Sequence, residues 1–319
     1  MAGTRALRWG GAARSVLDAR SAPAILDARS ARTGRVHSVF VRSFYVETEA
    51  GIACLGTPAL HDGPRNLIFV EPSGHALAAL CAGDAVQRAG TVLHVGAALA
   101  IELAGAIDWN PGPPPAFDAA RIRSALDRLA RLRLPDLGLA PLIAGPAHAW
   151  SDSALCARPD SAICTRSNSA LCARARPMLA ALDCWATSGA TTPLDVALGL
   201  IGLGPGLTPA GDDALGGAMI AARQFGFGDI ADRLAAAVLP LARRATNTIS
   251  LAHLDSAALG EGAEALHQTL HSLAEDDGRA LDGALERLGT IGHSSGWDAL
   301  AGTAAMLAGL ARRDDPRGG

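Results

Sequence analysis

A proline-rich stretch, WNPGPPPAF at 109–117, separates two parts of the sequence whose patterns favour different structures. Before it, residues 35–110 are rich in β-branched and aromatic residues that partly alternate with polar ones, which is typical of strands. After it, apolar residues recur at helical spacing, as in DAARIRSALDRLARLRL at 118–134. We therefore expect an α+β protein, with a β-rich N-terminal domain followed by a mainly helical C-terminal domain that carries glycine-rich loops.

The expected domains are an irregular leader or short helix at 1–34, a β-rich domain at 35–116 and a helical domain at 117–319. The β-rich domain should hold two or three strands in the segment after Arg35, with a turn near Glu49–Gly51, and further strands in NLIFVEP and TVLHVGAALAIEL. A repeat of period eight lies within 151–176 and contains three cysteines. Because eight residues is not a spacing of metal ligands, we expect a flexible insertion there.

Composition excludes several classes of function. All 28 basic residues are arginine, so neither a Schiff-base lysine nor a P-loop lysine exists, and arginine, backbone N–H groups or a metal would have to hold any phosphate. The formal net charge is −3 and no basic patch interleaved with aromatic residues is present, which argues against nucleic acid as a partner. The N-terminus lacks the apolar core of a secretory signal, and no run is long enough for a membrane span. We expect a cytoplasmic protein with reduced cysteines and no zinc site.

The segment GLGPGLTPAGDD, Gly202–Asp213, is the strongest candidate for a functional site. Alternating glycines at Gly202, Gly204 and Gly206 allow positive φ and a close approach of backbone to ligand. Thr208 followed by Pro209 predicts the start of a helix, whose unpaired N–H groups and partial positive charge would attract an anion. The segment therefore predicts a binding site for a small anionic substrate.

Two carboxylates next to this loop, Asp212 and Asp213, would repel a bare anion. Two arrangements remove the conflict: a divalent metal such as Mg²⁺ bridges aspartate and phosphate, or a carboxylate accepts hydrogen bonds from a substrate amide or amine. The sequence leaves both open. Known nucleotide motifs do not fit, because Leu207 stands where a third Rossmann glycine would be, and the Walker motif needs a lysine.

GHSSG at Gly292–Gly296 matches the G-x-S-x-G pattern of hydrolases, with Ser294 as nucleophile. No histidine follows His293, and the preceding ALERLG favours a helix over the required strand, so the serine-hydrolase interpretation is weak. The simpler interpretation is a capping box of Ser295 and Asp298 at the start of a helix, which leaves His293 and Ser294 in a second glycine loop open to ligand.

RRATNTIS, Arg243–Ser250, is the third polar segment. If it is helical, Arg243, Asn247 and Ser250 share one face, and so do Thr246 and Ser250. That face is either solvated or part of the site.

Taken in order, GLGPGLTPAGDD, TNTIS and GHSSGWDALAG resemble the AllH-like subunits of bacterial oxamate carbamoyltransferase, a family formerly catalogued as a domain of unknown function. The resemblance covers roughly residues 195–310, and the first motif is the most specific. It implies a multi-subunit transferase in allantoin breakdown, a part of purine degradation, that converts oxalurate and phosphate into oxamate and carbamoyl phosphate. Its partners would be a small anionic substrate (oxalurate, phosphate or carbamoyl phosphate) and the other subunits.

These observations lead to a set of expected roles. Asp212, Asp213, His293 and Ser294 are the candidate catalytic residues, and Asp212 with Asp213 the candidate magnesium ligands. The candidate residues for binding substrate or anion are Gly202, Gly204, Gly206, Thr208, Asn247, Ser250 and Ser295. No activated nucleophile is evident, so positioning and charge stabilisation would carry the reaction. A non-catalytic subunit that binds an anion or acts as a scaffold remains the alternative.

Overall fold

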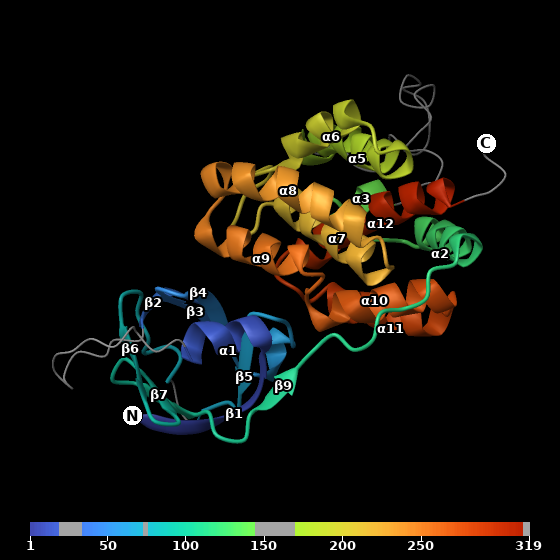
Figure 1. The fold of residues 1–319 in the computed structure, drawn as a ribbon. Helices are drawn as coiled ribbons and strands as arrows, with labels where there is room; N and C mark the ends of the chain where they lie inside the picture. Colours follow the sequence, from blue (N-terminus) through green and yellow to red (C-terminus); the bar gives the residue numbers. More distant parts are fainter. Residues whose placement is uncertain (19–33, 73–75, 144–169, 315–319) are drawn as a thin grey trace. The chain divides into compact units, whose positions relative to one another are not determined.

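The structure is a computed structural model, and it describes residues 1–18, 34–72, 76–143 and 170–314 (Figure 1). The chain divides into two compact units, Met1–Pro111 and Gly112–Gly319. The first contains strands and the second helices, which confirms the expected α+β class and the order of its parts. The boundary falls within the proline-rich stretch, a few residues before the expected position at 116–117.

The first unit is built on a single sheet. Its strands are β1 (Ala2–Gly10), β2 (Gly34–Val39), β3 (Ser43–Thr48), β4 (Gly51–Gly56), β5 (Asn66–Phe69), β6 (Ala85–Ala89), β7 (Val92–Val95), β8 (Leu99–Glu102) and β9 (Ile107–Trp109). Their order is β5-β4-β3-β2-β6-β7-β8-β1-β9, and β1 also pairs with β5. Eight strands therefore close into a barrel, and β9 extends the sheet from β1.

The expectation of an irregular leader is wrong for residues 2–10, which form β1. This strand pairs in parallel with β8 through Ala2–Arg5 and with β9 through Arg8–Gly10, and its other edge pairs antiparallel with β5. The sequence AGTRALRWG has little strand propensity of its own, but ladders on both edges satisfy its backbone. Residues 11–18 form helix α1 (Gly11–Asp18), while 19–33 lie outside the described residues.

Alternation along the strands makes the core of this unit. Along β3, for example, Phe44 and Val46 are fully buried while the residues between and after them are partly exposed. Helix α1 adds Val16 and Leu17 to the same cluster. A short 3-10 turn, η1 (Pro58–Leu60), links β4 toward β5.

The second unit is helical throughout its described part. Its elements are α2 (Ala119–Arg131), α3 (Ala140–Ile143), α5 (Ala170–Ser188), α6 (Thr191–Ala197), η3 (Leu198–Leu200), α7 (Ala210–Gln224), α8 (Gly228–Ala245), α9 (Thr248–Ala258), α10 (Glu264–Glu275), α11 (Gly278–Leu288) and α12 (Ser295–Arg313). The predicted helix at 118–134 is α2, and Asp118 caps it by accepting from two backbone N–H groups. The prediction of a flexible insertion at 151–176 is wrong for residues 170–176, because α5 begins at Ala170 and buries Cys172. Residues 151–169 lie outside the described residues.

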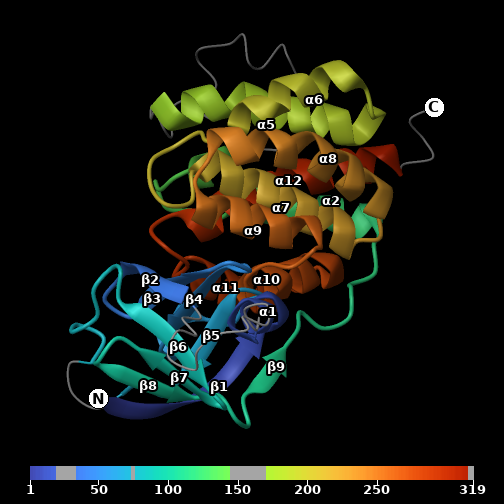
Figure 2. The same cartoon turned by 60° about the vertical axis from the view of Figure 1, so that its left-hand side comes forward.

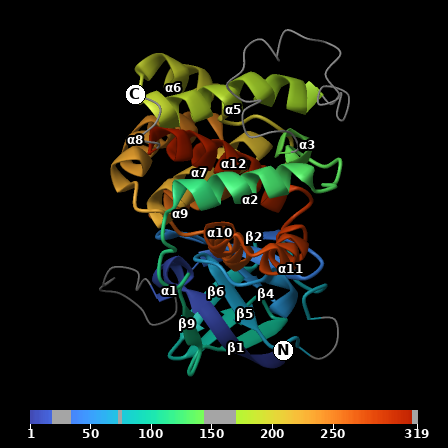
Figure 3. The ribbon, with the colours of Figure 1, turned by 90° about the vertical axis from the view of Figure 1, so that its right-hand side faces the viewer.

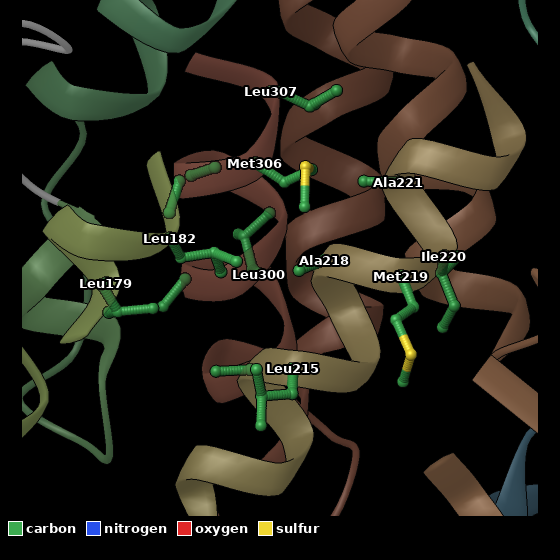
Figure 4. Close-up of a cluster of buried hydrophobic side chains, with 14 of the residues drawn as sticks. Leu179, Leu182, Leu215, Ala218, Met219, Ile220, Ala221, Leu300, Met306 and Leu307 are labelled. Carbon is green, nitrogen blue, oxygen red and sulfur yellow. The ribbon is translucent and has the colours of Figure 1, made fainter. Parts of the chain in front are cut away.

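Helices α7 and α12 form the centre of this unit (Figures 2 and 3). All residues of α7 except Asp213 and Arg223 are buried. The two helices pack closely because Gly217 and Gly302 face the other helix's backbone, where a methyl group on either would overlap a carbonyl. Figure 4 shows Leu300 and Met306 of α12 next to Leu179 and Leu182 of α5, with the apolar residues of α7 on the other side. No helix in the described ranges is long and apolar enough to cross a membrane.

Candidate functional site

The glycine loop leads from η3 into α7, and its backbone has the predicted conformation. Gly202, Gly204 and Gly206 have φ of 71°, 112° and 102°, all in the region that favours glycine. At Gly204 a side chain would also meet the N-terminus of α7, whereas Gly206 faces open space. The three glycines therefore serve different needs, and Gly206 has the most open surroundings.

Asp212 ties this loop to α9. Its Oδ1 accepts from the Gly202 N–H at 2.7 Å, and its Oδ2 accepts from the Ser250 hydroxyl at 2.6 Å and from the Thr246 hydroxyl. The side chain is almost fully buried, at 1% exposure. Both carboxylate oxygens are thus occupied by donors of the chain itself, so the geometry makes Asp212 an anchor of the loop.

The structure corrects the expected helix at Arg243–Ser250. Helix α8 ends at Ala245 and α9 starts at Thr248, so the supposed shared face of Arg243, Asn247 and Ser250 does not exist. Asn247 is the N-cap of α9, and its Oδ1 accepts from the N–H groups of Ile249 and Ser250 at 3.0 Å. The polar residues of TNTIS therefore terminate one helix and start another, because Asn and Thr compete for backbone hydrogen bonds at helix ends.

The second glycine loop lies between α11 and α12. Helix α12 begins at Ser295, one residue earlier than the predicted capping box of Ser295 and Asp298 requires, and Ser294 is its N-cap. The Ser294 hydroxyl donates to Asp298 Oδ2 at 2.8 Å. The pattern G-x-S-x-G follows a helix and not a strand, so it lacks the setting of a hydrolase nucleophile.

Asp298 is the residue of this region that sequence reasoning missed as part of the site. It is 1% exposed, and besides Ser294 it accepts from the Leu139 N–H at 2.6 Å. Gly138 packs so closely against Ser294 and Asp298 that a Cβ there would overlap them. Asp298 thus anchors the second loop as Asp212 anchors the first. The available signal was one carboxylate within the otherwise apolar stretch WDALAGTAAMLAGL.

A hydrogen bond between side chains joins the two loops. The hydroxyls of Thr208 and Ser295 lie 2.9 Å apart. The prediction that Thr208 caps α7 is wrong, since Pro209 holds the N-cap position and no side chain caps that end. Thr208 instead uses its hydroxyl to bring Gly202–Thr208 next to Gly292–Ser295.

Asp213 differs from the two anchors. Its Oδ2 is buried and has no hydrogen-bond partner within the described residues. Burial raises the pKa of Asp213 well above its usual range, and the nearby carboxyl groups of Asp298 and Asp212 add to this, while hydrogen bonding by Ser295 and Thr208 opposes it. Burial likewise raises the pKa of Asp298, against the hydrogen bonds from Leu139 and Ser294 and the charge of His293. Asp213 Oδ2 is therefore a buried acceptor that no group of the described residues satisfies.

The two glycine loops also hold backbone donors. Within the described residues, the N–H groups of Gly204, Gly206 and Leu207 have no hydrogen-bond partner, and neither have those of His293, Ser294 and Ser295. Helices α7, α9 and α12 all begin next to the three aspartates, so the positive ends of their dipoles partly offset the carboxylate charge. Most of the predicted site residues thus come together. Asn247 is the exception, because it is exposed and its side chain caps α9.

Magnesium does not fit this donor set well. Both oxygens of Asp212 already accept hydrogen bonds, and across the described ranges no three His, Cys, Asp or Glu side chains are grouped so as to hold a metal ion.

The architecture and the site together define a two-unit α+β protein whose helical unit presents polar loops at converging helix N-termini. Comparison with known families matches residues 200–307 to the model described as oxamate carbamoyltransferase subunit AllH, and residues 12–108 to the AllH family N-terminal domain. The chain belongs to the AllH family, as the motifs suggested. The first match contains both glycine loops and TNTIS, and the second covers most of the barrel unit. No solved structure matches the chain.

Proposed function

We propose that this chain is a subunit of a carbamoyltransferase that transfers the carbamoyl group of oxalurate to phosphate, giving oxamate and carbamoyl phosphate, in the breakdown of allantoin. Family membership supports the class of enzyme. The observation that carries the assignment to this site is the buried Oδ2 of Asp213, which has no partner among the described residues, in a side chain that hydrogen-bonds to Thr208 and Ser295 of the two glycine loops.

The two kinds of group match the two ends of the product. Backbone N–H groups of the loops would bind the phosphate oxygens, as they do at other helix N-termini. Asp213 Oδ2 would accept a hydrogen bond from the carbamoyl NH₂, which phosphate alone lacks. A buried acceptor without a partner costs free energy, so a ligand that supplies the missing N–H gains about 1–3 kcal/mol of affinity relative to one that does not.

In the transfer, a phosphate oxygen bonds to the carbamoyl carbon of oxalurate while the bond from that carbon to the oxamate nitrogen breaks. The departing nitrogen takes up the proton that phosphate gives up. The residues of this chain would hold both reactants in position and stabilise negative charge through the loop N–H groups. His293, which is exposed beside Ser294, would orient the reacting group.

The test is phosphate-dependent cleavage of oxalurate by the chain purified with its partner subunits. Asp213→Asn should lower kcat/KM by about 100-fold or more, the usual scale for loss of one positioned group. Asp282→Asn, the same change at an exposed position on α11, is the matched control and should have no effect. Full activity of the Asp213 variant would show that Asp213 takes no part in the reaction.

A non-catalytic subunit that binds the anion is the second candidate. It is favoured by the hydrogen bond from Ser294 to Asp298, a buried carboxyl group that also accepts from the Leu139 N–H, because among the described residues no histidine bonds to this hydroxyl to activate it. Calorimetry with carbamoyl phosphate would show binding in both cases. Turnover by the assembled enzyme that survives Asp213→Asn, together with loss of that binding, would favour this second candidate.

A further inference from the structure

We propose that the hydroxyl oxygen of Ser294 accepts a hydrogen bond from the NH₂ of the carbamoyl group, and that Asp298 is the positioning residue that turns this oxygen into an acceptor. The inference rests on the proposed function and deepens it, because it concerns how the same site recognises its class of substrate. The second glycine loop then selects an NH₂ group against a methyl group of similar size.

Ser294 holds the N-cap position of α12, but its side chain does not cap that helix. A serine at this position commonly accepts from a backbone N–H of the first turn. The N-cap residues of α2, α9 and α11 do so, each accepting from two N–H groups. Ser294 instead donates its hydrogen to Asp298 Oδ2 at 2.8 Å. Helix α12 therefore does not use the lone pairs of this oxygen, and the half-exposed residue is within reach of a ligand.

Asp298 fixes the direction of that hydrogen bond. Its Oδ1 faces the Leu139 N–H at 2.6 Å, and this group can only donate. A carboxylate accepts through both oxygens, so Oδ2 holds the hydrogen of Ser294. Burial raises the pKa of Asp298, whereas the two hydrogen bonds, the charge of His293 and the place of Asp298 in the first turn of α12 favour the charged form. With its hydrogen held on Asp298, Ser294 presents only acceptor lone pairs to a ligand.

The segment after α2 holds this pair in place. Gly138 has a φ of 50°, and a Cβ there would overlap Asp298 Oδ1 and Ser294 Cβ, so its backbone packs directly on both residues. Asp298 is only 1% exposed, which leaves little room for water to compete with Ser294 for the carboxylate. A hydroxyl that is already fixed loses little conformational entropy when a ligand binds, and it is therefore well suited to select between ligands.

This acceptor belongs to the same pair of joined loops as Asp213. Ser295, the next residue after Ser294, lies 2.9 Å from the Thr208 hydroxyl, and both of these hydroxyls bond to Asp213. An NH₂ group carries two hydrogens, which Asp213 Oδ2 and Ser294 Oγ would accept. A methyl group offers neither, so a ligand that carries one would leave both acceptors without a partner and bind more weakly.

Asp298→Asn reverses the hydrogen bond without removing a contact. The Leu139 N–H can pair only with the oxygen of the new amide, so the amide NH₂ has to face Ser294. That NH₂ donates to Ser294 Oγ, and the serine hydrogen then points toward the ligand. Ser294 becomes a donor where it was an acceptor. Both original hydrogen bonds have a counterpart in the variant, so the fold should be kept.

The experiment is calorimetry with carbamoyl phosphate and with acetyl phosphate, on the chain purified with its partner subunits, at a mildly alkaline pH that favours the ionised form of Asp298. The two ligands differ in NH₂ against CH₃ and share the phosphate, so effects on folding or on phosphate binding cancel in the ratio of their dissociation constants. The wild type should prefer carbamoyl phosphate by about tenfold or more, as expected for two hydrogen bonds. Ser294→Ala should lower this preference about fivefold, the scale of one hydrogen bond, and Asp298→Asn should lower it at least as much.

A double variant shows whether Asp298 acts through Ser294. If it does, adding Asp298→Asn to Ser294→Ala should lower the preference no further. The matched control is Ser124→Ala on α2, which removes a hydroxyl that donates to Asp276, at the end of α10, over the same 2.8 Å. This control should keep the full preference of the wild type.

A wild type that binds both phosphates equally, or binds neither, would overturn the role of Ser294. A preference that survives Ser294→Ala would do the same. Losses that add up in the double variant, or a full preference in Asp298→Asn, would overturn the positioning role of Asp298. Cleavage of oxalurate is measured separately. If the wild type cleaves none but keeps a preference that depends on Ser294, the proposed function fails while recognition of the NH₂ group stands.

Discussion

Replacing Asp212 by alanine should destabilise the helical unit strongly, although the residue lies in the candidate site. Its buried carboxylate accepts hydrogen bonds from Gly202, Thr246 and Ser250, which come from two separate segments. Hydrogen bonds to a charged acceptor contribute about 1.5–3 kcal/mol each, and breaking a buried charged network usually costs about 3–5 kcal/mol in total. We expect a loss of that size in the free energy of unfolding.

A domain of this size changes its midpoint by about 2–4 °C for each kcal/mol, so the melting temperature should fall by about 6–20 °C. Thermal unfolding followed by far-ultraviolet circular dichroism reports on the helical unit, since every regular element of its described part is a helix. The comparison is Asp213→Asn. The raised pKa of Asp213 means that ionisation destabilises the folded state at neutral pH, so removal of the charge should leave stability unchanged or increase it.

Variants of the two neighbouring aspartates should thus distinguish an effect on stability from an effect on activity. Asp212→Ala should lose both, whereas Asp213→Asn should lose only activity. If Asp212→Ala melts within about 2 °C of the wild type, the idea that Asp212 anchors the loop is refuted. Equal destabilisation by both variants would refute the idea that Asp212 anchors the loop while Asp213 does not.

Further predictions concern pH, packing and reactivity. Burial lowers the pKa of His267 from 6.5 to about 4, and its Nε2 accepts from Gly262. The folded state therefore binds fewer protons than the unfolded state between these values, and stability should fall by about 3 kcal/mol as the pH drops from 6.5 to 4. A His267→Gln variant whose urea midpoint keeps the full pH dependence would contradict this. Gly302→Ala should cost about 1–3 kcal/mol or more through overlap with α7, while Gly283→Ala on α11, where a methyl has room, should gain about 0.5–1 kcal/mol. Urea unfolding measures both. A fluorophosphonate probe should not label Ser294, and labelling seen by mass spectrometry would revive the hydrolase interpretation.

The sequence predicted the architecture well where local patterns are strong. The change of pattern at WNPGPPPAF gave the two units, and alternation in the segment after Arg35 gave strands β2, β3 and β4. Strand β1 was missed because its Ala, Arg and Gly residues carry no local signal. Its structure comes from partners more than 50 residues away, which no local pattern can show.

The sequence predicted which motifs form the site but not which role each aspartate has in it. The glycine φ angles follow from residue type, so they were accessible from the sequence. Which aspartates anchor a loop, and which one keeps a carboxyl oxygen without a partner, depends on hydrogen bonds from Thr246, Ser250 and Leu139, and thus on tertiary contacts. The sequence suggested only a local capping role for Asp298, because its partner Leu139 is 159 residues away along the chain.

Closure of the barrel by β1 has a consequence for folding. The first strand needs β5 at 66–69, β8 at 99–102 and β9 at 107–109 before its edges are satisfied. At synthesis rates of about 5–20 residues per second, the segment that becomes β1 waits about 5–20 seconds for its last neighbour. During that time it is an unpaired strand edge, open to association with other chains. Association therefore competes with closure of the barrel, so weak induction, which lowers the number of nascent chains present together, should raise the soluble yield.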